Sequence, residues 1–269
     1  MTPEETRNQI FASYIHIRIG LAALAFLFPI GLYVIGLAYG INPQDSMSAY
    51  YFAQMSDEKL QYVFPMRAWF VGILWAIGAF LYLYRGFSVT ENRFLNIAGA
   101  AAIVVALFPM GVPDVCKYCG TSALAWVHFT AAGVLFVCMS IVAWACTDET
   151  LVMLPEGQRK SFRATYSALA LAMTVAPIAV YLLIWRGREN HPGLFWAELT
   201  GVIVFAMYWA TKSYELDLLG TQQKKLRGDA PLSTPVQYRL DKGDGAKTFF
   251  GGINEKIDAL RQRTGKLLG

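Results

Sequence analysis

The chain has 269 residues, of which 55% are hydrophobic and only 16% are charged, and its net charge at pH 7 is +4. Typical soluble domains carry about 25% charged residues, so this composition excludes an ordinary soluble domain and favours a membrane protein. The sequence contains no stripe of basic residues interleaved with aromatic residues, and we therefore expect no nucleic-acid partner.

Six apolar runs follow one another along the chain, separated by polar segments. Each is close to the roughly 20 residues that a helix needs to span hydrocarbon: residues 19–39, 66–84, 94–110, 123–145, 166–185 and 194–210. They predict an all-α fold, a six-helix transmembrane bundle over residues 1–212. Residues 213–269 are predicted to form a polar cytoplasmic tail. Its segment 253–268 has the apolar spacing of an amphipathic helix, which could lie on the membrane surface or pack against the loops.

Small residues and prolines predict how these runs pack. Gly72 and Ala76 are four residues apart, a spacing that lets another helix approach closely. The third run is rich in alanine and glycine over residues 98–102, which suits the crowded centre of a bundle. Pro29 and Pro177 are expected to bend the first and fifth runs.

The distribution of basic residues predicts the orientation of the bundle, because lysine and arginine near span ends favour the cytoplasmic side. Most of them fall on the side that holds both termini. The chain is therefore predicted to lie in a bacterial inner (plasma) membrane with its N-terminus and C-terminus in the cytoplasm. The cytoplasmic set is Arg7, Arg18, Arg85, Arg93, Arg159, Lys160, Arg163, Lys212, Lys224, Lys225 and Arg227, and the opposite set is Lys59, Arg67, Lys117, Arg186 and Arg188.

Several polar side chains fall at the non-cytoplasmic end of the predicted bundle, where they could line an outward-facing recess. Polar groups within spans are costly and are often functional. The candidates are Ser48, Arg67, Asp114, His128 and Glu198. In one interpretation, Asp114, His128 and Glu198 hold a metal ion or form a proton relay. In the other, they form a structural network in which Arg67 pairs with Asp114 or Glu198.

Two of the four cysteines, Cys116 and Cys119, lie in the polar segment between the third and fourth runs. An oxidising outer compartment would favour a disulfide between them. Alternatively, the two thiols could bind zinc together with His128 and His191. A redox-active pair and two unpaired thiols remain the other interpretations. We expect no cofactor, with zinc as the alternative.

Five short motifs carry a resemblance to a known group of proteins: Ser46-Met-Ser-Ala-Tyr-Tyr51, Ala106-Leu-Phe-Pro109, His128, Phe195-Trp-Ala-Glu198 and Trp209-Ala-Thr-Lys212. At these positions the chain resembles uncharacterised bacterial multi-pass membrane proteins of the DUF998 type, whose layout is similar to that of DRAM-like proteins. The resemblance implies a six-helix membrane bundle and brings no established activity.

A looser likeness is to the ceramidase-type membrane hydrolases, which use a serine, an aspartate and three histidines around zinc. Ser48, Asp114 and His128 could play three of those parts. The His-x-x-x-His pair of that group is absent from this chain.

The function predicted from the sequence is a structural, sensing or small-solute-binding membrane protein with an outward-facing polar recess. The alternatives are a metal-dependent membrane hydrolase acting on lipid and a small transporter. The lipid bilayer is the expected partner, and a homo-oligomer or a second membrane protein remains open.

Overall fold

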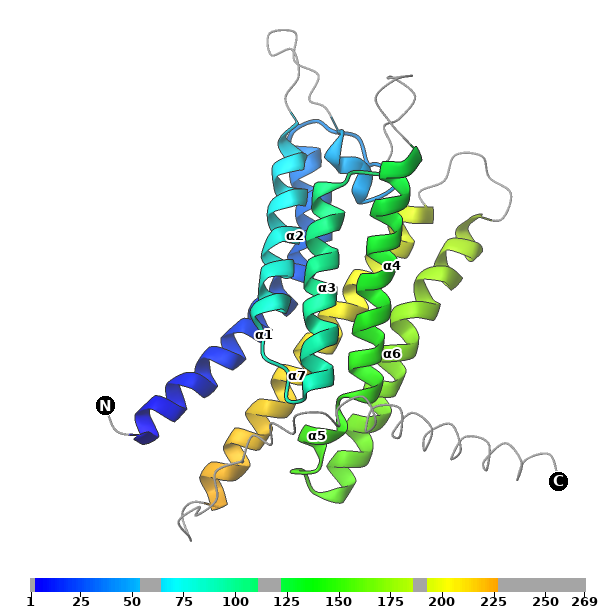
Figure 1. Ribbon diagram of the computed structural model, residues 1–269. Helices are drawn as coiled ribbons and strands as arrows, with labels where there is room; N and C mark the ends of the chain where they lie inside the picture. Colours follow the sequence, from blue (N-terminus) through cyan, green and yellow to red (C-terminus); the bar gives the residue numbers. More distant parts are fainter. Residues whose placement is uncertain (1–2, 54–63, 111–121, 186–192, 227–269) are drawn as a thin grey trace, which may run out of the picture.

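The computed structural model describes residues 3–53, 64–110, 122–185 and 193–226, and within these ranges the chain is helical and has no strands. Six long helices dominate it (Figure 1), together with one 3₁₀ turn and one short helix. The long helices are α1 (Pro3–Ala38), α2 (Pro65–Leu83), α3 (Val89–Leu107), α4 (Ser122–Ala145), α6 (Glu156–Trp185) and α7 (Gly193–Leu226), and the short elements are η1 (Ser48–Tyr51) and α5 (Asp148–Leu151).

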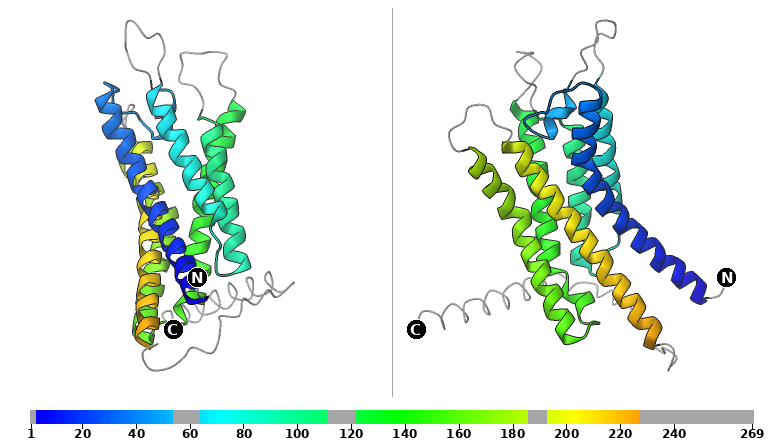
Figure 2. Two further views of the ribbon diagram at one scale, coloured as in Figure 1. Left: turned by 90° about the vertical axis from the view of Figure 1, so that its left-hand side faces the viewer. Right: turned by 180° about the vertical axis from the view of Figure 1, so that it is seen from behind.

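The long helices pack in chain order around a closed ring. Each contacts the next one along the sequence, and α7 returns to contact α1. The helices run alternately up and down, so that η1 lies at one end of the bundle and α5 at the other (Figures 1 and 2). We call these the η1 end and the α5 end. The first turn of α1 and the last turn of α7 both lie at the α5 end.

Five of these helices are long and apolar enough to cross a membrane: α1, α2, α4, α6 and α7. Large apolar side chains on their outer faces are exposed, among them Leu83 at 70%, Ile178 at 61% and Leu183 at 64%. Exposed apolar surface of this extent suits hydrocarbon and not water. By helix length and hydropathy, the chain is a multi-pass membrane protein.

The third predicted run corresponds to α3, which has no 18-residue stretch as apolar as those of the other five long helices. Its first turn carries Thr90, Glu91, Asn92 and Arg93, and only the rest of the helix is apolar. The turn is well capped, because Ser88 Oγ accepts the Glu91 N–H at 3.1 Å and Glu91 Oε2 accepts the Phe87 N–H at 2.7 Å. A serine followed three residues later by a glutamate is the sequence pattern of a capping box.

Helices α2 and α3 cross closely at Gly78 and Gly99. A Cβ atom added at Gly78 would lie 2.8 Å from the Gly99 carbonyl oxygen, and one added at Gly99 would lie 2.6 Å from the Gly78 carbonyl oxygen. Only glycine allows the two backbones to come this near. The close contact expected at Gly72 was wrong, because an added Cβ there meets nothing within 4 Å. The spacing of small residues along α2 does not by itself show which face of the helix meets a neighbour.

We predict that Gly78→Ala and Gly99→Ala each lower the free energy of unfolding, by about 1–3 kcal/mol, since the added methyl group overpacks the crossing. Gly72→Ala is the matched control on the same helix and should be neutral or slightly stabilising. Unfolding of the purified protein in detergent would measure all three variants. Equal stability of Gly78→Ala and Gly72→Ala would show that the crossing is not tight.

Candidate functional site

Three of the five predicted recess residues meet at the η1 end. Ser48 opens η1, while His128 and Glu198 lie near the starts of α4 and α7. Ser48 Oγ is 3.0 Å from His128 Nε2 and 3.3 Å from Glu198 Oε1. His128 is 1% exposed and Ser48 is 6% exposed. A hydroxyl group therefore stands between an imidazole and a carboxylate in a buried setting, and we call the three residues the Ser48–His128–Glu198 cluster.

The loop that carries Ser48 is held on the bundle by α7. Glu198 Oε2 accepts the N–H of Met47 at 2.5 Å, and the Phe195 N–H donates to the Asp45 carbonyl at 2.8 Å. Within the loop, Ser46 Oγ accepts the Ala49 N–H at 3.0 Å. Glu198 thus has two tasks, since one oxygen holds the loop backbone and the other faces Ser48.

Hydrogen-bond geometry limits where the protons of the cluster can be. His128 Nδ1 lies 2.7 Å from the Phe108 carbonyl oxygen. A carbonyl oxygen can only accept, so Nδ1 carries a hydrogen and Nε2 is the acceptor in the neutral ring. Ser48 has one hydroxyl hydrogen, which can point to Nε2 or to Glu198 but not to both.

Two arrangements satisfy every member of the cluster, and they contain the same number of protons. In the first, a protonated Glu198 donates to Ser48, and Ser48 donates to neutral His128. In the second, a charged His128 donates to Ser48, and Ser48 donates to ionised Glu198. The Ser48 hydroxyl converts one arrangement into the other by passing a proton on. Removing the shared proton leaves one of the two contacts without a hydrogen.

Arg67, the fourth predicted recess residue, makes different contacts. Its Nε donates to the Tyr51 carbonyl at 3.1 Å, and its guanidinium lies over the rings of Tyr51 and Phe64, at 4.5 and 4.2 Å from their centroids. These contacts fasten the end of η1 to the start of α2. The expected pairing of Arg67 with Glu198 is therefore not formed, since Glu198 contacts Met47 and Ser48 instead. The alternative pairing with Asp114 stays a prediction, because Asp114 lies outside the described residues.

The remaining candidates lie outside the described residues. Asp114, Cys116, Cys119 and His191 fall in 111–121 and 186–192, so the predicted disulfide and the zinc alternative stay predictions. Within the described ranges, no three histidine, cysteine, aspartate or glutamate side chains are grouped as a metal site would need. The cluster itself offers one imidazole and one carboxylate to a metal ion.

A second polar centre, at the α5 end, was not predicted. Lys212 Nζ contacts Glu215 Oε2 at 3.0 Å, with the two side chains 1% and 0% exposed. Lys212 also donates to Thr150 Oγ1 at 2.6 Å, and the Tyr166 hydroxyl donates to Glu215 Oε2 at 2.5 Å. This ion pair therefore joins α7 to α6 and to the α5 turn.

Arg18 of α1 and Glu91 of α3 extend this centre across the ring. Arg18 is fully buried and donates to the Lys212 carbonyl at 3.2 Å and to the Tyr84 hydroxyl. Glu91 is 1% exposed and interacts electrostatically with Lys212 and Arg18. Two buried cations thus balance two buried carboxylates. We call Arg18, Glu91, Tyr166, Lys212 and Glu215 the α5-end network.

Two features of the sequence indicate this network, although a count of basic residues at span ends does not reveal them. Arg18 lies directly before the first apolar run with an isoleucine on each side, and Lys212 and Glu215 have the i, i+3 spacing of a helical ion pair. Treated only as charges near span ends, Arg18 and Lys212 predict the orientation of the bundle and not their own pairing. Both residues lie inside the membrane spans of the structure, Ala12–Ala38 and Gly193–Leu219, and a charge inside a span is more often buried and paired than exposed.

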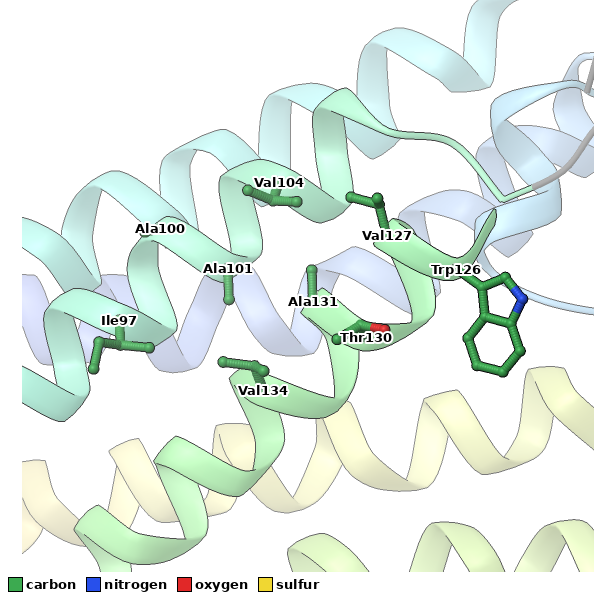
Figure 3. A pocket seen from close by; sticks show the side chains of 9 residues that line it. All are labelled: Ile97, Ala100, Ala101, Val104, Trp126, Val127, Thr130, Ala131 and Val134. Atoms are coloured by element: carbon green, nitrogen blue, oxygen red, sulfur yellow. The ribbon is translucent and has the colours of Figure 1, made fainter. Parts of the chain in front are cut away.

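An apolar groove of about 550 Å³ runs along the outside of the bundle between α3 and α4 (Figure 3). Its lining includes Ile97 and Val104 from α3 and Trp126, Thr130 and Val134 from α4. Trp126 is 73% exposed. The lining supplies one hydroxyl group, so the groove suits acyl chains and has no chemistry for a polar substrate.

Comparisons with known proteins add no identity, because no family model, no curated protein and no solved structure matches this chain. The site must therefore be interpreted from its own geometry.

We predict that Lys212→Met lowers the free energy of unfolding by about 3–5 kcal/mol, because it leaves Glu215 buried without its cation. Removing both charges in Lys212→Met/Glu215→Leu should restore part of the loss. Lys160→Met is the matched control, since Lys160 and Glu156 form an exposed pair at 2.8 Å and such pairs contribute about 0–1 kcal/mol. Unfolding in detergent gives all three values, and equal losses for Lys212→Met and Lys160→Met would contradict a buried pair.

Proposed function

We propose that this chain is a six-span membrane protein of the bacterial plasma membrane that senses protons at an outward-facing polar recess. The recess is the Ser48–His128–Glu198 cluster. In this proposal α3 crosses the membrane with the other five helices, and the α5 end faces the cytoplasm. The likeness to proteins of the DUF998 type belongs to the proposal as well.

The distribution of charge supports this orientation. Arg159, Lys160 and Arg163 lie at the start of α6, at the α5 end. Arg67, at the start of α2, lies at the η1 end. Basic residues gather at cytoplasmic span ends, so the α5 end is the cytoplasmic one in the proposal.

The observation that carries the proposal is the position of the Ser48 hydroxyl between His128 Nε2 and Glu198 Oε1. With the shared proton, every contact of the cluster is a hydrogen bond. Without it, either the imidazole or the carboxylate faces a lone pair of Ser48. In the second arrangement Glu198 is ionised and accepts from Met47 and Ser48, while His128 also donates to Ser48. The loop formed by residues 42–53 is therefore held by more contacts with the shared proton than without it. A change of pH outside the membrane thereby changes how firmly this loop is held on the bundle.

The clamped loop makes one more hydrogen bond with the proton than without it, so clamping and proton binding favour each other. The hold on the loop is therefore present at low pH and weakens as the pH rises. Asp45, Tyr50, Tyr51 and Arg67 are the further ionisable groups of the loop and of the start of α2.

We predict that amide hydrogen exchange in residues 42–53 speeds up as the pH rises, beyond the intrinsic pH dependence of exchange. A hydrogen bond to a charged group contributes about 1.5–3 kcal/mol, which corresponds to roughly a tenfold to hundredfold change in protection. Glu198→Gln should abolish this dependence and keep the loop protected, because its amide group donates to Ser48 and accepts from Met47 at every pH.

Glu156→Gln is the control, since Glu156 is exposed at the α5 end. Mass spectrometry of the protein in lipid nanodiscs would follow the exchange. A wild-type loop whose corrected protection does not change with pH would refute proton sensing, and so would a Glu198→Gln loop that titrates like the wild type.

A second candidate function is hydrolysis of an acyl lipid at Ser48. The distance of 3.0 Å between Ser48 Oγ and His128 Nε2 is that of a nucleophile and its general base, and the site would lie at the membrane surface. The expected result is that a fluorophosphonate probe labels the wild type and leaves Ser48→Ala unlabelled. Absence of label on the wild type would rule out an activated serine, and metal analysis of the same sample would test the zinc-dependent form of this proposal.

A further inference from the structure

Four buried polar atoms of α1 and α7 have no hydrogen-bond partner in the described part of the chain. They are Nε of Arg18, Oε1 of Glu215, the hydroxyl of Tyr208 and Nε1 of Trp209. The four side chains are at most 1% exposed. Buried polar groups in native proteins almost always have a partner, from the protein or from ordered water. Leaving four of them without one would be costly, most of all for the charged pair.

These four side chains belong to one place in the bundle. The ring centroids of Tyr208 and Trp209 are 5.3 Å apart, and Trp209 lies 5.3 Å from the ring of Tyr84. The Arg18 guanidinium is 5.0 Å from the same Tyr84 ring. Arg18 also interacts electrostatically with Tyr208 and Glu215. These four atoms therefore lie around the α5-end network, whereas a fifth buried atom without a partner in the described residues, Ser140 Oγ, lies on α4.

The chemistry of the four atoms restricts what can occupy the space among them. Arg18 Nε and Trp209 Nε1 can only donate, the ionised Glu215 Oε1 can only accept, and the Tyr208 hydroxyl can do both. An anion would satisfy the donors but would face the Glu215 carboxylate. A cation would satisfy Glu215 but would face Arg18 and Lys212. A neutral molecule that both donates and accepts satisfies the whole set.

We propose that the α5-end network is a hydration site, in which bound water molecules join Arg18, Tyr208, Trp209 and Glu215. The contacts of Lys212 and Tyr166 with Oε2 of Glu215 leave Oε1 as the acceptor for water. A water molecule that donates to Oε1 can accept from Arg18 or Trp209 in return. The α5-end network shares no residue with the Ser48–His128–Glu198 cluster, so this proposal is independent of the proposed function.

Bound water of this kind explains how four charges stay buried between helices. Each charge gains hydrogen bonds from the water molecules that its apolar neighbours cannot supply. The water molecules can also reorient, so the hydrogen bonds of the network can rearrange. The network lies where α1, α3, α6 and α7 meet the α5 turn. From the turn between α2 and α3, the Phe87 ring lies over Arg18 at 5.3 Å and over Lys212 at 6.0 Å.

Hydroxyl-radical footprinting by X-ray radiolysis tests the proposal on the full chain in lipid nanodiscs. Radicals formed from bound water modify the side chains beside it, even where bulk solvent does not reach. Tyr208 and Trp209 are expected to be modified at rates well above those of Met173 and Phe70, which are equally buried at 1% and 2% exposed but lie in apolar surroundings. Thioethers react readily with hydroxyl radicals, so Met173 is a stringent control.

Modification of Tyr208 and Trp209 at or below the rate of Met173 would overturn the proposal, because it would mean that the network is dry or holds an ion. Replacing chloride in the buffer by gluconate is expected to leave the rates unchanged. Rates that rise when chloride is removed would assign the site to an anion and would equally overturn the proposal. The wild-type protein serves in every arm, so no variant has to fold.

Discussion

The cost of placing a polar group in hydrocarbon shapes this molecule more than any other constraint. Within the bilayer core no water is available to satisfy an unpaired donor or acceptor. The chain meets this constraint on α7, which carries two hydrogen-bonded carboxylates, the partly buried Glu198 near its start and the fully buried Glu215 farther along. Glu198 holds the η1 loop and Glu215 holds Lys212 and Tyr166. At 1.5 Å per residue, the two carboxylates are roughly 25 Å apart along the helix, which is close to the thickness of the hydrocarbon core of about 30 Å.

Close packing at small residues stabilises the part of the bundle between the two carboxylates. Gly78 and Gly99 let α2 and α3 meet backbone to backbone, and Gly201 of α7 receives the Phe136 ring, which an added Cβ would meet at 3.1 Å. Dispersion contacts of this kind are the main attraction between helices in lipid, where apolar burial alone gives little. The polar ends fix which helices are neighbours, and the small residues fix how closely they approach. The outward-facing apolar side chains then need only match the lipid.

Much of the fold could be predicted from the sequence, because hydropathy is summed over a whole helix and tolerates local errors. The helices matched the six apolar runs, although the polar first turn of α3 leaves it short of the apolar character of the others. Ser48, His128 and Glu198 were placed at one end by the alternation of spans, which fixes depth without fixing contacts. The α5-end network was missed, because pairing Arg18 with residues near position 212 requires knowing that α7 returns to α1. The contact expected at Gly72 failed for a related reason, since a repeat of small residues does not show which neighbour it meets.

The most direct test of this account is the sidedness of two exposed positions, because it decides whether α3 crosses the membrane. Single cysteines would be placed at Asn42, at the η1 end, and at Gly157, where an added Cβ meets nothing within 4 Å, in a chain whose four native cysteines are replaced. A membrane-impermeant thiol reagent would then be applied to intact cells. Six spans place the two cysteines on opposite faces, so the reagent should label Asn42→Cys from outside and reach Gly157→Cys only after the membrane is opened. Labelling of both positions from the same side would mean that α3 does not cross, and the two polar centres would then not lie at opposite membrane surfaces.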